Sequence, residues 1–132
     1  MIFHTFAHRS LLKAIIYLKT YKTMQNSSYF LLPNKHRKVE KIPYSEILYL
    51  EGNINYTLIH LKGGQVKLSP RTLLFHVNNS LNESFIRIHR AFCVNKEHIE
   101  YYDEKENAHF LLLKSGTQLA VSRRKRHALL AG

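Results

Sequence analysis

Basic side chains alternate with apolar ones in two short segments of the chain, and both patterns suit the binding of an anion. The first segment is Phe85-Ile-Arg-Ile-His-Arg-Ala-Phe-Cys-Val-Asn95, and the second is Val121-Ser-Arg-Arg-Lys-Arg126. Such alternation predicts strands whose apolar side chains anchor in a core while the basic side chains face outward beside a loop. An arginine held in this way can donate two parallel hydrogen bonds to a phosphate or to a guanine edge. The pattern therefore favours nucleic acid as the partner.

The charge balance of the whole chain agrees with this interpretation. The 132 residues include 20 lysines and arginines against 9 acidic residues, which gives a formal net charge of +11. A field of this sign attracts polyanions before any specific contact forms. The length suits one domain, and a hydrophobic fraction of 45% is enough for a compact core.

Cysteine usage and hydropathy predict a cytoplasmic protein without a membrane partner. The single cysteine, Cys93, lies in an apolar segment, which predicts a buried inert thiol and a reducing compartment. No apolar run approaches the roughly 20 residues that a membrane span needs. A signal-peptide h-region with a cleavage site is also missing from the sequence.

Catalytic and metal-binding patterns are weak in this sequence. Although there are nine histidines, His4 and His8 are the pair nearest to a ligand spacing, and no carboxylate or cysteine accompanies them. Gly63-Gly64 suits a hairpin turn and not a phosphate loop. We therefore predict no enzyme activity, no catalytic residue, no metal, no cofactor and no small-molecule substrate.

The chain divides near residue 28. Residues 1–28 contain no acidic residue, and Leu11, Ile15 and Leu18 share one helical face, which predicts a basic amphipathic extension. This helix could pack on the domain, fray, or dock on a membrane surface or a partner. Residues 29–132 form the predicted domain.

Short strands joined by turns dominate residues 29–132. Ser69 as N-cap and Pro70 at the first helical position predict a helix over 70–82, and Ser122 is expected to begin a last helix that ends at Leu130. The segment Asp103-Glu-Lys-Glu-Asn107 contains three acidic residues and predicts a turn. The predicted strands lie at 30–32, 38–42, 47–50, 56–61, 65–68, 85–95, 99–102, 108–113 and 118–121.

The order of these segments closely resembles the LytTR DNA-binding domain of bacterial response regulators. The matching pieces are Ile47-Leu-Tyr-Leu-Glu-Gly52, Asn55-Tyr56, the Gly-Gly hairpin, a short helix, residues 85–95, Ile99, a Ser-Gly turn and Val121-Ser-Arg-Arg124. The resemblance covers about residues 29–130. It implies a mainly β fold of small antiparallel sheets with one short helix, which reads double-stranded DNA with loops at sheet edges and regulates transcription.

The resemblance also assigns roles to particular residues. It implies that Arg90, Arg124 and the loop Asn53 to Tyr56 contact bases or enter grooves, with Asn55 suited to an adenine edge and the arginines to guanine. The phosphate backbone would then be held by Arg87, His89, Arg123, Lys125 and Arg126. The full set of predicted DNA-binding residues is Asn53, Asn55, Tyr56, Arg87, His89, Arg90, Arg123, Arg124, Lys125 and Arg126.

The family pattern further implies paired direct repeats and a possible homodimer on DNA, while a monomer in solution is equally allowed. Bending of the duplex is expected for a separate reason, because loops on one elongated face reach successive grooves only if the DNA curves toward them. Many relatives carry a phosphorylated receiver domain of a two-component system, but here the first acidic residue is Glu40 and the sole aspartate, Asp103, lies in a predicted turn. We therefore expect no phosphorelay control within this chain, which would be a stand-alone regulator, a truncated protein or a fragment of a longer one.

Several alternatives stay open on the sequence alone. Arg87 and Arg90 could pair with Glu83 or Glu97, His89 could be structural, and residues 123–126 could be a charged tail. Cations in the first turn of a helix oppose its dipole, which favours an anion beside residues 123–126 if a helix begins at Ser122. The tyrosines suit strands better than base stacking. The rival functions are a basic protein- or membrane-surface-binding module and an RNA-binding small β domain.

Overall fold

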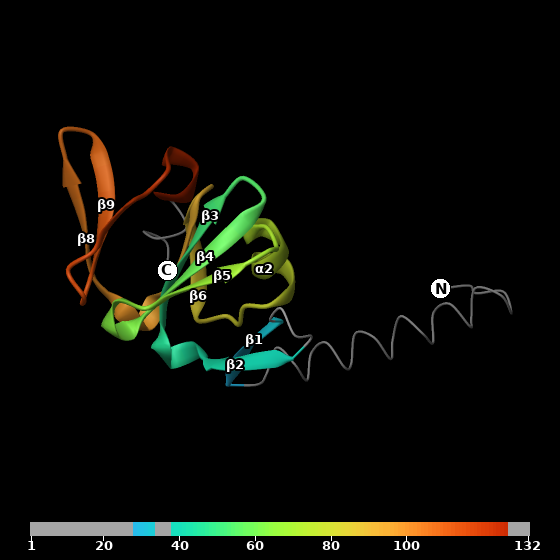
Figure 1. Ribbon diagram of the computed structural model, residues 1–132. Coiled ribbons are helices and arrows are strands. Elements are labelled where there is room, and N and C mark those ends of the chain that lie inside the picture. The colour runs from blue at the N-terminus through green and yellow to red at the C-terminus, as the bar shows by residue number, and fades with distance from the viewer. Residues whose placement is uncertain (1–27, 34–37, 127–132) are drawn as a thin grey trace, which may run out of the picture.

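Ten strands in three antiparallel sheets make up the described part of the chain, which comprises residues 28–33 and 38–126 of the computed structural model (Figure 1). The mainly β fold with one short α-helix confirms the prediction, while the predicted N-terminal helix falls on residues outside these ranges. The first sheet pairs β1 (Tyr29–Pro33) with β2 (Val39–Pro43). The second has the order β5 (Val66–Ser69), β4 (Tyr56–Leu61), β3 (Ile47–Asn53), β7 (Phe92–Asn95), β6 (Phe85–His89). The third has the order β10 (Gln118–Ala120), β9 (Ala108–Leu113), β8 (Ile99–Lys105).

The five-stranded sheet buries apolar side chains on both faces, because successive residues of a strand point to opposite sides. Leu50, Ile59 and Cys93 pack on one face against the first sheet and the helix α2 (Leu73–Asn79). Tyr49 and Val94 pack on the other face against the third sheet, in a cluster with Leu111, Leu113 and Leu119. The central strands are thus held between two layers, and the ends of these strands are left to form the edge of the domain.

The helix is shorter than the sequence predicts, and its N-cap is a different residue. α2 begins at Leu73 after Thr72, whose Oγ1 accepts a hydrogen bond from the Phe75 amide at 3.2 Å. Ser69 cannot cap it because Ser69 is the last residue of β5 and pairs with Thr57 of β4. Its buried hydroxyl instead hydrogen-bonds to His76 Nε2 at 2.6 Å. The prediction of a helix over 70–82 with Ser69 as N-cap is therefore wrong in its limits.

Hairpin turns fix the length of several strands. Gly63 and Gly64 have φ values of 81° and 87°, which confirms the predicted glycine turn between β4 and β5. The acidic turn predicted over 103–107 is only two residues long, because β8 continues to Lys105 and Glu106 and Asn107 make the turn with φ values of 51° and 67°. Figure 1 shows this turn at the same end of the molecule as the β3–β4 turn.

Candidate nucleic-acid interface

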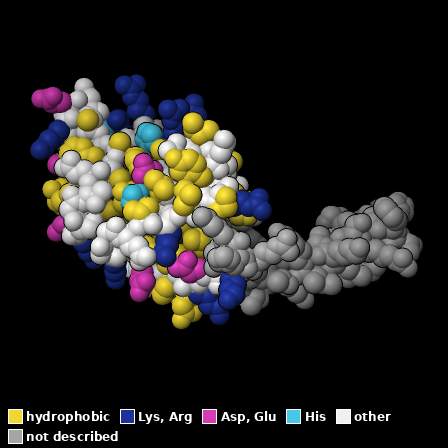
Figure 2. All heavy atoms as spheres, in the orientation of Figure 1, with side chains coloured by type: hydrophobic (Ala, Val, Ile, Leu, Met, Phe, Trp, Pro, Cys, Tyr) yellow, Lys and Arg dark blue, Asp and Glu magenta, His cyan; other side chains and the backbone are white. Residues whose placement is uncertain are grey.

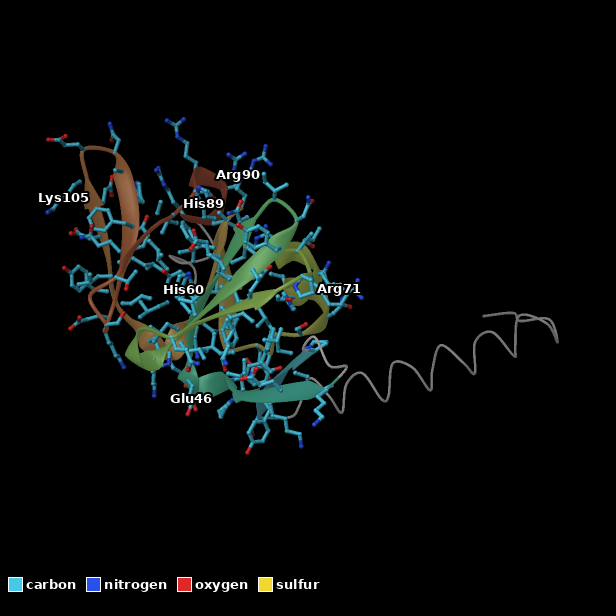
Figure 3. All side chains as sticks on the ribbon, in the orientation of Figure 1. Glu46, His60, Arg71, His89, Arg90 and Lys105 are labelled. Carbon is cyan, nitrogen blue, oxygen red and sulfur yellow. The ribbon has the colours of Figure 1, made fainter. Side chains whose placement is uncertain are left out.

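The β6–β7 turn presents Arg90 and is closed by Arg87. The Nε of Arg87 donates to the His89 carbonyl at 3.3 Å, and its Nη2 donates to the Arg90 carbonyl at 2.6 Å. Arg87 is half-buried, whereas the Arg90 side chain is exposed at the end of the molecule (Figure 3). Among the residues that the structure describes, no ion pair joins either arginine to Glu83 or Glu97. Arg87 therefore stabilises the turn from which Arg90 projects.

His89 and a bulge shape the same turn. Arg87 pairs with Cys93, but His89 pairs with Phe92, so β6 has one extra residue between these two positions. Such a bulge bends a strand and re-aims the side chains beside it. His89 Nδ1 accepts a hydrogen bond from the Ala91 amide at 3.1 Å, and the ring packs on Phe92 with centroids 5.6 Å apart. His89 thus has a structural partner on one nitrogen and is half-buried.

The β3–β4 turn lies next to the β6–β7 turn. The Gly52 amide donates to the Ala91 carbonyl at 2.8 Å and joins the two hairpins. Glycine is needed at this position because a Cβ there would lie 2.9 Å from the Cβ of Leu73 in α2. Asn53 Nδ2 donates to the Tyr56 hydroxyl at 2.7 Å across the turn. The side chains of Asn53, Asn55 and Tyr56 are all exposed.

The third segment of this edge follows β10. The Ser122 amide donates to the Ile88 carbonyl of β6 at 2.8 Å, which brings residues 122–126 beside the β6–β7 hairpin. Arg123–Lys125 form one 3-10 turn after Ser122, whose side chain makes no capping bond. The predicted helix over 122–130 therefore starts as a 3-10 turn, and residues 127–130 lie outside the described part. One turn has only a small dipole, so the dipole argument for an anion loses most of its weight.

The basic residues of this segment have different environments. Arg123 and Arg124 are exposed, and Lys125 and Arg126 are half-buried. Arg126 Nη2 donates to the Asn107 carbonyl of the β8–β9 turn at 3.2 Å. Its Nε is buried and has no hydrogen-bond partner within the described ranges. Arg126 is thus tied to the third sheet, while Arg123 and Arg124 are free to reach a ligand.

Cys93 is buried behind this basic edge, where charges of the β6–β7 hairpin and of residues 122–126 affect the pKa of its thiol. Burial raises the pKa of its thiol to about 12, and the positive charges of Arg87 and Lys125 oppose that rise. The thiol is therefore protonated at neutral pH, which argues against a nucleophile and agrees with the predicted inert cysteine. Figure 2 shows several Lys and Arg side chains at the end of the molecule where Figure 1 shows the β3–β4 turn and residues 123–125, and others elsewhere on the same face.

Other candidate sites are weaker. Tyr44 and Tyr49 are buried in the two cores, and Tyr102 is hydrogen-bonded to His109, so these tyrosines are structural. Tyr56 and Tyr101 are exposed, and only Tyr56 belongs to the edge. The described residues include no group of three or more metal-binding side chains. In the same part of the chain, no helix is long and apolar enough to cross a membrane.

Ile54 lies inside the loop Asn53 to Tyr56, but the predicted DNA-binding residues do not include it. It is the first of the two residues between Asn53 and Tyr56, it has a φ of 51°, and its side chain is 89% exposed. An isoleucine in a loop bounded by Gly52, Asn53 and Asn55 is the signal that could have drawn attention to it, because the flanking types are ordinary turn formers and isoleucine is not.

Comparison with known proteins supports the resemblance. The chain matches the family model of the LytTr DNA-binding domain over residues 37–131. A similar solved structure is the LytTr DNA-binding domain of a protein described as a methyl-accepting/DNA response regulator from Bacillus cereus, with a TM-score of 0.65, 23% sequence identity, and coverage of 81% of this chain and 100% of that one. No curated protein matches the chain. At this identity the structural likeness shows the fold, and the family match over most of the chain shows that it belongs to the LytTR family of DNA-binding domains found in transcriptional regulators.

Proposed function

We propose that this chain recognises a specific sequence in double-stranded DNA through the edge formed by the β3–β4 turn, the β6–β7 turn and residues 122–126. The observation that carries the proposal is the pair of backbone hydrogen bonds from Gly52 to Ala91 and from Ser122 to Ile88, both at 2.8 Å. They bring three segments far apart in the sequence to one edge. Each segment contributes exposed polar or basic side chains there.

Arg90 and Arg124 are proposed to read bases. Both side chains are exposed, and within the described ranges neither takes part in an ion pair. A guanidinium without a partner inside the protein keeps its donors for guanine O6 and N7 in the major groove. Asn55, exposed in the β3–β4 turn, has the amide chemistry for an adenine edge, while Asn53 and Tyr56 hold one another and define the shape of the turn.

The remaining basic residues are proposed to hold the phosphate backbone. Arg123 is exposed, and Lys125 and Arg126 lie on its flank with part of their surface accessible. Arg87 donates to the turn through Nε and Nη2. A phosphate beside this hairpin would therefore contact Nη1 of Arg87 and the accessible side of the His89 ring. Contacts of this kind fix the register of a protein on the duplex without choosing the sequence.

The proposed setting is a bacterial transcriptional regulator in the cytoplasm. A net charge of +11 supports electrostatic capture of DNA before specific contacts form. Two copies on paired direct repeats would place two such edges along one duplex, and the duplex would bend where three segments of one edge reach successive grooves. Double-stranded DNA stays favoured over a protein, a lipid surface or RNA because the edge combines exposed arginines with short turns that carry amide side chains.

A binding comparison tests the proposal. Gel shifts with a random-sequence duplex, single-stranded DNA and structured RNA, together with flotation of anionic vesicles, would be run at two salt concentrations. We expect the duplex to be preferred, and selection from random duplex DNA to enrich one sequence. Equal affinity for single strands, RNA or vesicles, or a selection that enriches nothing, would contradict the proposal.

A further inference from the structure

Ile54 stands at the tip of the β3–β4 hairpin in a conformation that its side chain disfavours. Its φ of 51° lies in the left-handed region, which glycine adopts freely and a β-branched residue rarely enters. The first position of a two-residue hairpin turn with positive φ ordinarily selects glycine. The fold does not need an isoleucine here, because the side chain is 89% exposed and belongs to neither core cluster.

The turn around Ile54 is held on both sides, so the backbone from which its side chain projects has a fixed place. Asn53 and Tyr56 pair in the β3–β4 ladder and their side chains share a 2.7 Å hydrogen bond. The Gly52 amide is bonded to the Ala91 carbonyl next to Arg90. An aliphatic group is therefore presented at a defined point beside the β6–β7 turn, on the edge proposed to bind DNA.

The chemistry of this side chain narrows what it can contact in a duplex. Phosphates and the hydrogen-bonding edges of bases suit the cations and amides that surround Ile54, and they do not suit an alkyl group. The apolar group that DNA displays to proteins is the C5-methyl of thymine in the major groove. Ile54 lies at the turn between β3 and β4, where these two strands of the five-stranded sheet end on the edge proposed to meet the groove.

We propose that Ile54 packs on a thymine methyl group in the major groove and thereby makes an A·T pair part of the recognised sequence. This inference rests on the proposed function, since it assigns one more specificity-determining residue to the same edge. A strained and solvent-exposed backbone position that serves no packing role is the kind of outlier from which a function can be inferred.

The test uses the duplex that wild-type protein enriches from random DNA. Each thymine of that duplex is replaced in turn by deoxyuridine, which keeps every hydrogen-bonding group and lacks only the methyl. We expect one replacement to weaken wild-type binding about fourfold, the factor that one buried methyl group is worth. The same replacement should leave the affinity of Ile54→Gly unchanged, while Ile54→Val, which keeps an apolar β-branched side chain, should retain the preference for thymine.

Glu106→Gly is the matched control, because Glu106 also has a φ of 51° at a hairpin tip. It should keep the full effect of deoxyuridine. If every replacement changes the affinity of wild type and of Ile54→Gly by the same factor, the inference is overturned while the proposed function stands. The same holds if Ile54→Gly binds the thymine and the deoxyuridine duplexes more weakly by an equal factor. If no duplex is enriched at all, the proposed function fails and the inference fails with it.

Discussion

Arg87 and Arg90 lie three residues apart in the β6–β7 hairpin and have different roles. Arg87 donates two hydrogen bonds to the carbonyls of the turn, and Arg90 has an exposed guanidinium. Charge is equal at both positions, so charge alone cannot distinguish them. The difference lies in the acceptors of the two guanidinium groups. Arg87 donates to backbone oxygens of the protein, whereas Arg90 faces solvent and can donate to a ligand.

Substitution of Arg90 should reduce selectivity more than general affinity for DNA. We expect Arg90→Ala to cost about 1–3 kcal/mol on the enriched duplex and to relax the preference at one base pair. Arg90→Lys keeps the charge but loses the bidentate fork, so it should bind non-specific duplex normally and still lose selectivity. Competition titrations against a panel of single-base variants measure both quantities. Lys125→Ala is the comparison, and it should weaken all sequences alike; an unaltered panel for Arg90→Ala would remove this residue from the site.

His76 links β5 to α2 and should make the stability of the domain depend on pH. Burial, and then the positive charge of Arg71, lower the pKa of His76 from 6.5 to about 4, and the neutral ring bonds to Ser69 at 2.6 Å and Ser80 at 2.8 Å. Because the folded pKa is depressed, the unfolded chain binds the extra proton first. The stabilisation is therefore complete above pH 6.5 and is lost as the pH falls towards 4, by about 3 kcal/mol.

Urea unfolding at pH 7.5, 6, 5 and 4 measures this loss. His76→Gln keeps a hydrogen-bonding side chain that does not titrate, so its stability should fall less steeply than that of wild type over the same range. Parallel curves for the two proteins would show that His76 is not responsible for the pH dependence.

At the scale of elements, the alternation of apolar and polar residues predicts the order of the strands, but it does not predict where each strand begins and ends. Residues 56–61 form β4 over the predicted range, and the burial of their side chains alternates along the strand. Residues 85–95 also alternate, but they form two strands, because Arg90-Ala91 makes a turn without the glycine, proline or asparagine that usually marks one. The turn is specified instead by the donors of Arg87, which no local pattern reveals.

Long-range pairing explains the other departures from the sequence prediction. Asp103, Glu104 and Lys105 have the composition of a turn, yet they extend β8 because they pair with β9, where Glu104 lies opposite His109 with 3.4 Å between Oε1 and Nε2. Ser69 has the composition of an N-cap, but its backbone belongs to the β4–β5 ladder. The site residues could be named by resemblance; that they share an edge depends on hydrogen bonds between segments more than thirty residues apart, such as that from Ser122 to Ile88.

Gly52 couples α2 to the β3–β4 turn, so its substitution should disturb both stability and DNA binding. In Gly52→Ala the new Cβ would meet the Leu73 Cβ at 2.9 Å, and because that atom is next to the helix backbone, α2 or β3 must shift. We expect a loss of about 1–3 kcal/mol in unfolding free energy, as for other overpacked sites. DNA affinity per folded molecule should fall as well, because the Gly52 amide holds the Ala91 carbonyl.

Gly63→Ala is the matched control for this prediction. Its new Cβ meets nothing within 4 Å, but φ is +81°, so the variant should lose about 1 kcal/mol through backbone strain. Gly63 lies in the β4–β5 turn, at the other end of β4 from the proposed interface. DNA affinity per folded molecule should therefore stay normal; a fall equal to that of Gly52→Ala would mean that affinity simply follows stability.

At the scale of the whole molecule, the fold brings the ends of several strands close together. Three sheets pack so that the turns after β3 and β6 and the segment after β10 meet at one end of the molecule (Figure 1). The two hairpin turns are short and are held by their own strands, so their backbone needs little ordering when a ligand binds. A small β domain can in this way offer several rigid contacts to DNA without a recognition helix.

The salt dependence of binding should report how much of the molecular charge touches the duplex. A net charge of +11 attracts DNA as a whole, but only cations that neutralise phosphates release counterions. If about 6–10 phosphates are contacted, the logarithm of the affinity should fall with the logarithm of salt concentration with a slope of about −5 to −9. Removing both Arg123 and Arg126 as the double variant Arg123→Gln/Arg126→Gln should reduce the steepness by about 2. Lys62→Gln removes one charge at an exposed site on the far end of β4 and should leave the slope unchanged. A reduction of about 1 there, the same per charge as in the double variant, would mean that the duplex does not lie along the proposed edge.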